Sequence, residues 1–163
     1  MTTDSEDIEL AERLRIMMVE RGKTVSTAES CTSGRIASTL TSVSGASDYF
    51  LGGLVAYQDE VKIAHLGVTA EMIAKHDVVS REVVEQMVRG ACRFFGSDYA
   101  LASTGYAGGG TESIPSGTIW IGWGSDGDVH SLRLSKDEGR EKNTSNAAKK
   151  AIQSFIESLE TLK

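Results

Sequence analysis

The sequence predicts an α/β domain in which helices cover both faces of a mixed, mostly parallel β-sheet. Segments with the apolar spacing of helices alternate with segments rich in branched and aromatic residues. Late in the chain, two strand-like segments flank "GSDGD", which predicts an antiparallel hairpin. The 163 residues are enough for one core. We therefore expect a single domain over residues 1–163, built as three layers, α/β/α.

The first half of the chain begins with a predicted helix over residues 7–21. Leu14 and Met18 belong to its apolar face, and Gly22 ends the pattern. Residues 1–6 precede this pattern and are expected to be disordered. Three elements are then predicted: a strand over 23–30, a helix over 34–43 and a strand over 48–58.

The second half begins with helical segments. "DEVKIAHLG" contains a helical turn that Gly67 ends, and Thr69 and Ser80 can cap the two helices that follow. The helix after Ser80 carries regularly spaced apolar residues that predict a buried face. The remaining predicted elements are a strand over 98–105, a hairpin over 118–135 and a helix over about 144–162.

Composition and charge exclude several classes of function. The formal net charge of -6 argues against a nucleic-acid partner, which needs positive charge to neutralise phosphates. No apolar run approaches the roughly 20 residues that span a bilayer, and the acidic N-terminus is no signal peptide, so we expect a cytoplasmic protein without membrane partners. The cysteines and histidines have no metal-ligand spacing, so no metal and no cofactor are predicted; they are Cys31, Cys92, His65, His76 and His130.

The segment "TAESCTSG", residues 27–34, places Ser30 between a strand and a helix. Ser30 can be a helix N-cap, which is the common role of serine at such a junction. It can also be a nucleophile, with N–H groups of the helix N-terminus stabilising an oxyanion. A nucleophilic serine needs a base, and a lysine can act as one if burial lowers its pKa. Lys62, just after the next strand, is a candidate, with Tyr57 nearby in the sequence. Both can equally be ordinary surface and packing residues.

A second glycine-rich turn, "TGYAGGG", follows the strand over 98–105. Glycines let a backbone approach a ligand closely, but the segment matches neither common phosphate-binding pattern and can equally be a flexible loop. Arg140 can bind a phosphate or carboxylate, or be a surface charge. Cys31 is expected to be a small packed side chain.

Together these motifs resemble the C-terminal domain of CinA, the competence/damage-inducible family. The resemblance rests on "TAESCTSG", "GGLVAYQDEVKIAHLGV", "VSREVVEQMVRGA", "DYALASTGYAGGGTESIPSGTIWIG" and the late "GR", in family order over about residues 10–159. It implies an α/β/α fold and a homodimer. The amidase members of the family convert nicotinamide mononucleotide to nicotinic acid mononucleotide and ammonia. They resemble serine amidases that use lysine as the base and need no metal.

The resemblance also implies residue roles. Ser30 matches the family's nucleophile, Lys62 its base and Tyr57 an assisting, hydrogen-bonding residue. Other matching positions would bind the small-molecule nucleotide substrate: Thr32, Gly34, Thr104, Gly105, Ala107, Gly108 and Arg140, the last at the substrate phosphate.

The chain departs from the family pattern at the two glycine-rich turns. Ser33 stands where the family has glycine, and Tyr106 replaces a small aliphatic residue. The second loop is shorter, with Ile114 in place of lysine and Ser116 in place of valine. The Ser30, Tyr57 and Lys62 set is intact. Two alternatives therefore stay open beside the amidase: a non-catalytic nucleotide-binding protein, and an amidase for another substrate.

Overall fold

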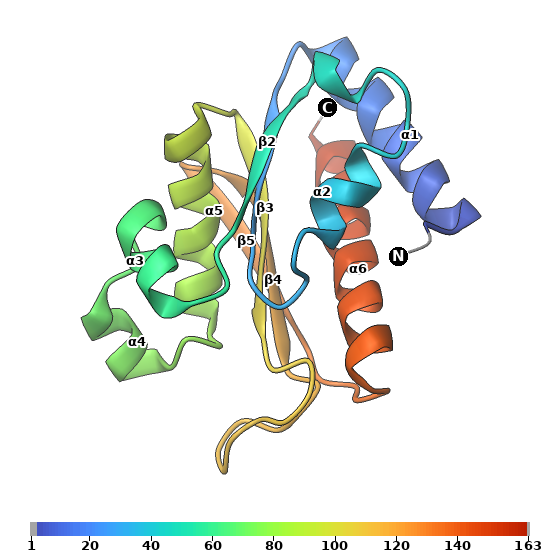
Figure 1. Cartoon of the computed structure of the whole chain (residues 1–163). Helices are drawn as coiled ribbons and strands as arrows, with labels where there is room; N and C mark the ends of the chain where they lie inside the picture. Colours follow the sequence, from blue (N-terminus) through green and yellow to red (C-terminus); the bar gives the residue numbers. More distant parts are fainter. Residues whose placement is uncertain (1–2, 163) are drawn as a thin grey trace.

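A computed structural model describes residues 3–162 of the chain (Figure 1). Helices and strands alternate along it, as the sequence predicts. The helices are α1 (Ser5–Arg21), α2 (Arg35–Leu40), α3 (Asp59–Leu66), α4 (Ala70–His76), α5 (Arg81–Phe95) and α6 (Arg140–Thr161), with a short 3₁₀ turn at Ala46–Asp48. The strands are β1 (Val25–Glu29), β2 (Phe50–Val55), β3 (Tyr99–Gly105), β4 (Ile119–Ser125) and β5 (Asp128–Leu134).

The five strands form one sheet in the order β2-β1-β3-β4-β5. β1 lies in the middle of a parallel group, paired with β2 and with β3. β3, β4 and β5 then pair antiparallel, and β4 and β5 form the hairpin predicted around "GSDGD". The mixed sheet is confirmed, with parallel pairing confined to β2, β1 and β3. The C-terminal ends of these three strands consequently lie at the same edge of the sheet.

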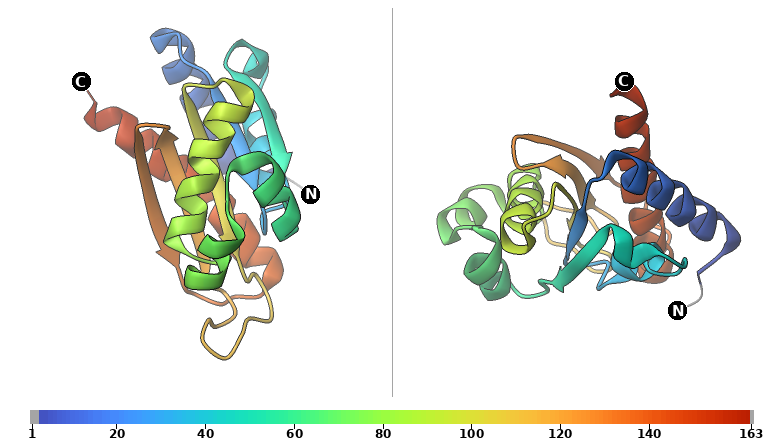
Figure 2. Two further views of the ribbon diagram at one scale, coloured as in Figure 1. Left: turned by 90° about the vertical axis from the view of Figure 1, so that its left-hand side faces the viewer. Right: turned by 90° about the horizontal axis from the view of Figure 1, so that it is seen from above.

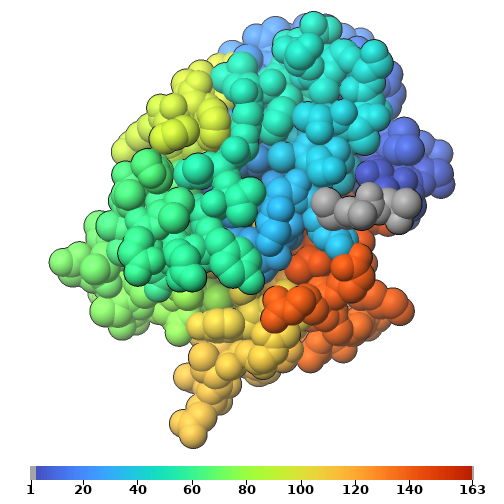
Figure 3. Space-filling model, viewed as in Figure 1, coloured from blue at the N-terminus to red at the C-terminus, as the bar shows by residue number. Residues whose placement is uncertain are grey.

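Helices cover both faces of the sheet, which confirms the three layers. α1, α2 and α6 lie on one face, and α3, α4 and α5 on the other (Figures 1 and 2). Each face has its own apolar core: Leu14, Ile36 and Phe155 belong to the first, and Val84 and Met87 to the second. The loop that joins β3 to β4 projects from the body of the molecule, yellow to orange in Figure 3.

The expectation of disorder at the N-terminus is wrong for residues 3–6. Asp4 caps α1 by accepting a hydrogen bond from the N–H of Asp7, and α1 begins at Ser5. Lys149 of α6 holds this end through an ion pair with Glu6 at 3.0 Å. A negatively charged side chain is stabilised at the N-terminus of a helix, where the helix dipole is positive. The spacing of apolar residues does not reveal this stabilisation. Residues 1–2 lie outside the described residues.

The helix boundaries follow from local hydrogen bonds. Thr69 and Ser80 cap α4 and α5 as predicted, accepting from the N–H groups of Met72 and Val83. The last helix begins at Arg140 rather than near Thr144. Its polar first turn concealed this start, because the apolar pattern begins only one turn later.

α3 packs closely against α5 because α5 carries a glycine at the contact. A Cβ built at Gly90 would lie 2.1 Å from the backbone oxygen of Leu66. The absent side chain therefore lets α5 approach the end of α3, the helix that carries Lys62. No helix within residues 3–162 has the length and apolarity needed to cross a membrane.

Candidate active site

The candidate site lies where the parallel strands end. Ser30 directly follows β1, Tyr57 follows β2 by two residues, and Thr104 and Gly105 end β3. Between these strand ends is a cavity of about 210 Å³. It is lined by Ser30, Cys31, Tyr57, Asp59, Lys62, Val78, Val79, Thr104, Gly105, Tyr106, Ala107, Gly108 and Arg140. Eight of the ten residues that the sequence singled out thus meet at one place.

Lys62 and Ser30 are in direct contact on the wall of this cavity. The Lys62 Nζ lies 3.0 Å from the Ser30 Oγ, as a hydrogen bond between the two side chains. Lys62 is buried at 1% exposure and Ser30 at 8%, so bulk water is largely excluded from the pair. Burial lowers the pKa of Lys62, while the nearby Asp59 carboxylate acts in the opposite direction. A lysine so placed loses its proton more readily than a surface lysine, as a general base must.

Tyr57 contributes its main chain rather than its phenol. Its carbonyl oxygen accepts a hydrogen bond from the Lys62 Nζ at 3.0 Å, which directs the amine toward Ser30. The Tyr57 residue is 57% exposed, and within residues 3–162 its phenol makes no hydrogen bond to Ser30 or Lys62. The expected direct assistance by the phenol is therefore not seen in this arrangement.

Ser30 is not the N-cap of the helix that follows it. The N-cap of α2 is Gly34, which has no side chain to offer. The buried Glu29 instead accepts hydrogen bonds from the N–H groups of Ile36 at 2.8 Å and Ala37 at 3.0 Å. The capping alternative is wrong, and so is the expectation that this helix end stabilises an oxyanion, because Glu29 already occupies its N–H groups.

Glu29 also fixes the turn that carries Ser30. Its carboxylate accepts from the Thr32 hydroxyl at 2.6 Å, and the Thr32 and Ser103 hydroxyls lie 2.7 Å apart. Burial raises the pKa of Glu29, while the hydroxyl and N–H donors around it counteract this by stabilising the carboxylate. Thr32 is buried in this network, and neither Thr32 nor Gly34 lines the cavity.

Replacing Glu29 with glutamine is expected to destabilise the fold by about 1–3 kcal/mol. Glutamine keeps the size but brings an NH₂ group against the N–H groups of α2, so one buried donor loses its acceptor. Thermal unfolding of Glu29→Gln measures this change. Glu60→Gln, an exposed glutamate of α3, is the matched control. An unchanged melting temperature for Glu29→Gln would show that the network does not hold the turn.

Ser33, at a position where the family resemblance predicts glycine, adopts a glycine-like backbone. Its φ is +52°, a region that costs a side-chain-bearing residue about 1–2 kcal/mol. Ser33→Gly removes this strain but loses about 0.5–1 kcal/mol in backbone entropy, so we expect a gain of up to about 1 kcal/mol. Chemical denaturation measures it. Gly96→Ser, at a φ of +69° with open space around it, should change stability in the opposite direction. A loss of stability in Ser33→Gly would contradict this account.

The second glycine-rich turn forms the other wall of the cavity. The Thr104 hydroxyl donates to the carbonyl of Val78 at 2.9 Å and ties β3 to the segment before α5. Tyr106 donates to the Asp77 carboxylate at 3.1 Å, so this departure from the family pattern has a structural role. Arg140 lies at the cavity rim, and its guanidinium is within 3.5 Å of the Gly108 carbonyl.

The sequence reasoning missed several lining residues. Cys31, which the sequence predicts to be a packed side chain, also lines the cavity. Burial raises the pKa of its thiol to about 12, so it stays protonated at neutral pH. Asp59 precedes Lys62 by one helical turn, and this spacing was the available signal. No sequence pattern marks Val78 and Val79 as lining residues, because only the tertiary fold brings them to the cavity. Within residues 3–162, no group of three or more His, Cys, Asp or Glu side chains is placed to hold a metal ion.

Comparison with known proteins assigns the family. The family model of the CinA C-terminal domain matches residues 7–159. The chain belongs to the CinA C-terminal domain family. Solved CinA-family structures share the fold, including the competence damage-inducible protein A of Klebsiella pneumoniae, with a TM-score of 0.92, 32% identity and coverage of 96% of this chain and 99% of that one. A protein of the family from Agrobacterium tumefaciens also has a TM-score of 0.92 at 32% identity, covering 98% and 99%.

Curated CinA relatives are of two lengths. The nicotinamide-nucleotide amidohydrolase PncC of Escherichia coli K12 is 43% identical over 121 residues, which is 73% of this chain and 73% of that protein. A CinA-like protein of Cytophaga hutchinsonii is 43% identical over 129 residues, 78% of this chain and 31% of that protein. The chain thus spans about a third of the length of the CinA-like relatives and most of PncC.

Proposed function

We propose that the protein is a serine amidohydrolase that converts nicotinamide mononucleotide to nicotinic acid mononucleotide and ammonia. The observation that carries the proposal is the 3.0 Å contact between the Lys62 Nζ and the Ser30 Oγ in a cavity. The similarity to PncC supports the choice of substrate. No metal and no cofactor take part in the proposed reaction.

Ser30 attacks the carboxamide carbon while neutral Lys62 takes the proton from its hydroxyl. The tetrahedral intermediate collapses, the C–N bond breaks, and the leaving nitrogen receives that proton from Lys62 to depart as ammonia. Water then attacks the acyl-enzyme ester while Lys62 accepts a proton from it. The C–O bond to Ser30 breaks, Lys62 returns that proton to the Ser30 oxygen, and nicotinic acid mononucleotide leaves. The Tyr57 carbonyl holds the Lys62 amine in place throughout.

The oxyanion of this reaction needs N–H donors close to Ser30. In the turn after β1, the N–H of Ser30 donates to Ser103 and that of Ser33 donates to Ser30. We assign the oxyanion to the N–H group of Cys31, which belongs to the same turn, lines the cavity and makes no backbone hydrogen bond within residues 3–162.

The substrate phosphate is assigned to Arg140 and the adjacent glycine-rich turn. Arg140 is exposed at the cavity rim, where its guanidinium can form charge-assisted hydrogen bonds with a phosphate. Thr104, Gly105, Ala107 and Gly108 line the space between this arginine and Ser30. An ammonia-release assay with nicotinamide mononucleotide tests the function, and absence of release at any pH would overturn it.

A second candidate function is nucleotide binding without turnover. The departure at Tyr106 favours it, because this side chain lines the cavity where the family resemblance predicts a small aliphatic residue. Calorimetric binding of nicotinamide mononucleotide without ammonia release would select this candidate. The third alternative is an amidase for another substrate. Ammonia release from another carboxamide in a substrate panel, but not from nicotinamide mononucleotide, would select it.

The proposed assembly is a homodimer in the cytoplasm. Strand β2 lies at an edge of the sheet, and its Leu51 and Val55 are 47% and 49% exposed. Exposed apolar residues on an open edge are typical of a surface that pairs with another chain. A light-scattering mass equal to one chain would overturn the dimer.

A further inference from the structure

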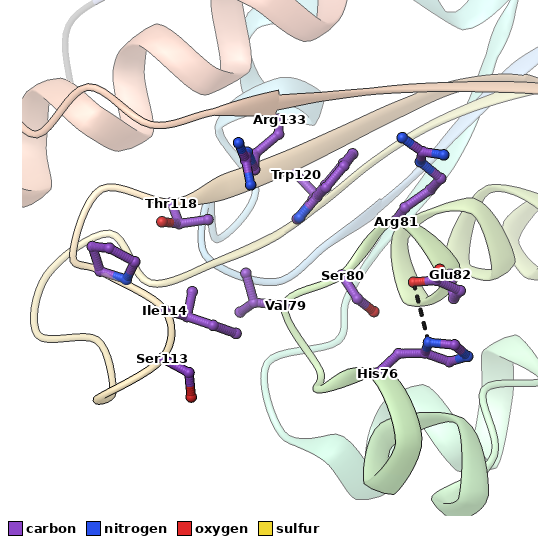
Figure 4. Close-up of a pocket in the computed structure, with 11 residues that line it drawn as sticks. His76, Val79, Ser80, Arg81, Glu82, Ser113, Ile114, Thr118, Trp120 and Arg133 are labelled. Carbon is purple, nitrogen blue, oxygen red and sulfur yellow. Dashed lines mark ion pairs between the residues drawn. The ribbon is translucent and has the colours of Figure 1, made fainter.

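A second cavity, outside the proposed active site, lies between the start of α5, the β4–β5 hairpin and the projecting loop (Figure 4). Its volume is about 390 Å³, within the range of small-molecule sites in proteins. It shares one lining residue, the buried Val79, with the proposed catalytic cavity. The proposed amidase reaction uses none of its polar side chains.

Two arginines and a tryptophan gather on one side of this cavity. The Arg81 guanidinium carbon lies 5.6 Å from the centre of the Trp120 ring, and Arg133 is the cross-strand partner of Trp120. The Trp120 ring lies between the side chains of Arg81 from α5 and Arg133 from β5, and all three residues line the cavity (Figure 4).

Within the described residues, neither the Arg81 nor the Arg133 guanidinium has an anionic partner. Within residues 3–162 the arginine ion pairs belong to Arg13, Arg15, Arg35 and Arg93. The side chains of Arg81 and Arg133 make neither an ion pair nor a hydrogen bond among these residues, so their donors face the cavity and solvent. Glu82 is the acidic group in the lining, and its carboxylate lies 3.7 Å from His76 and points toward it (Figure 4). The free charge of the cavity is therefore positive.

We propose that this cavity binds a phosphate-bearing small molecule of nucleotide size, with the guanidinium groups of Arg81 and Arg133 supplying the positive charge that attracts the phosphate. Arginine is suited to phosphate because its planar guanidinium can donate two parallel hydrogen bonds. A volume of about 390 Å³ leaves room for more than the phosphate alone. Thr118 and Ser113 add hydroxyl groups at the loop side, where an attached sugar can be bound. This site is independent of the amidase proposal.

The fluorescence of Trp120 provides a test that needs no enzyme activity. The chain contains two tryptophans, so Trp123→Phe leaves Trp120 as the reporter. We expect AMP to change this fluorescence saturably, and adenosine at the same concentrations to leave it unchanged. A titration with inorganic phosphate distinguishes two kinds of site. If inorganic phosphate saturates the fluorescence change and AMP does not bind more tightly, the cavity is a free-anion site. If AMP saturates the change and inorganic phosphate does not, the cavity is a nucleotide site. The first result overturns the proposed nucleotide-sized ligand, and the second supports it.

Variants locate the binding. In the Trp123→Phe background, Arg81→Gln with Arg133→Gln is expected to weaken AMP binding about tenfold or more, since each removes charged hydrogen bonds. Arg93→Gln, on the same helix but paired with Asp126, is the matched control and should bind normally. Arg81→Lys with Arg133→Lys keeps the charges and should lose less affinity. The proposal is overturned if AMP gives no saturable change, if adenosine binds as well as AMP, or if Arg140→Gln rather than the double variant removes the signal.

Discussion

Ser30→Ala is expected to abolish ammonia release from nicotinamide mononucleotide, lowering turnover by about 10⁴-fold or more. Alanine cannot form the acyl-enzyme, so the route through a covalent intermediate is closed. Substrate binding should change little, because Arg140 and the second glycine-rich turn are untouched. A coupled ammonia assay with calorimetric titration of the substrate separates the two effects.

The matched control for this substitution is Ser38→Ala, an exposed serine of α2. It removes the same hydroxyl outside the cavity and should keep full activity. Full activity in Ser30→Ala would end the serine mechanism, even if the protein proved to be an amidase. Loss of activity together with loss of binding would place Ser30 in the binding site rather than in catalysis.

Lys62→Met is expected to lower turnover by about 10²–10⁴-fold, the usual contribution of a general base. Methionine fills the same space without an amine, so Ser30 keeps its place but loses its proton acceptor. In the parent protein, activity should rise with pH through the pKa of Lys62, which burial places below its usual 10.5. In Lys62→Met this rise should disappear. Lys75→Met, an exposed lysine of α4, is the matched control.

The same substitution should not weaken the fold. The pKa of Lys62 is lower in the folded chain than in the unfolded one, so the unfolded state holds its proton to higher pH. The contribution of Lys62 to the free energy of unfolding therefore rises as the pH increases from its folded pKa to 10.5. This contribution is absent at pH values below the folded pKa. Lys62→Met removes the cost of burying a charge at neutral pH, and its melting temperature should equal or exceed that of the parent. A marked fall in melting temperature would mean that Lys62 is retained for stability rather than chemistry.

The sequence predicted most elements because their signals are local. The caps at Thr69 and Ser80 need only one helical turn to form. The hairpin between β4 and β5 depends on a short turn and two apolar runs. Errors arose where polar groups dominate an element: Asp4 caps α1 ahead of its apolar pattern, and the first turn of α6 is polar. Such ends are stabilised by charges and side-chain hydrogen bonds, which apolar spacing does not record.

The sequence by itself determined the alternation of helices and strands and the motifs around Ser30, Lys62 and the second glycine-rich turn. Only the tertiary structure decided which groups touch. It placed the Lys62 Nζ 3.0 Å from the Ser30 Oγ. It showed that the Tyr57 carbonyl, and not the Tyr57 phenol, contacts Lys62. It also showed that the Glu29 carboxylate accepts hydrogen bonds from the N–H groups at the start of α2. The physical reason is that these contacts join residues on neighbouring strand ends and a helix beyond them. Their distances depend on how the parallel strands pair and how closely α3 packs against α5, and no local pattern encodes either.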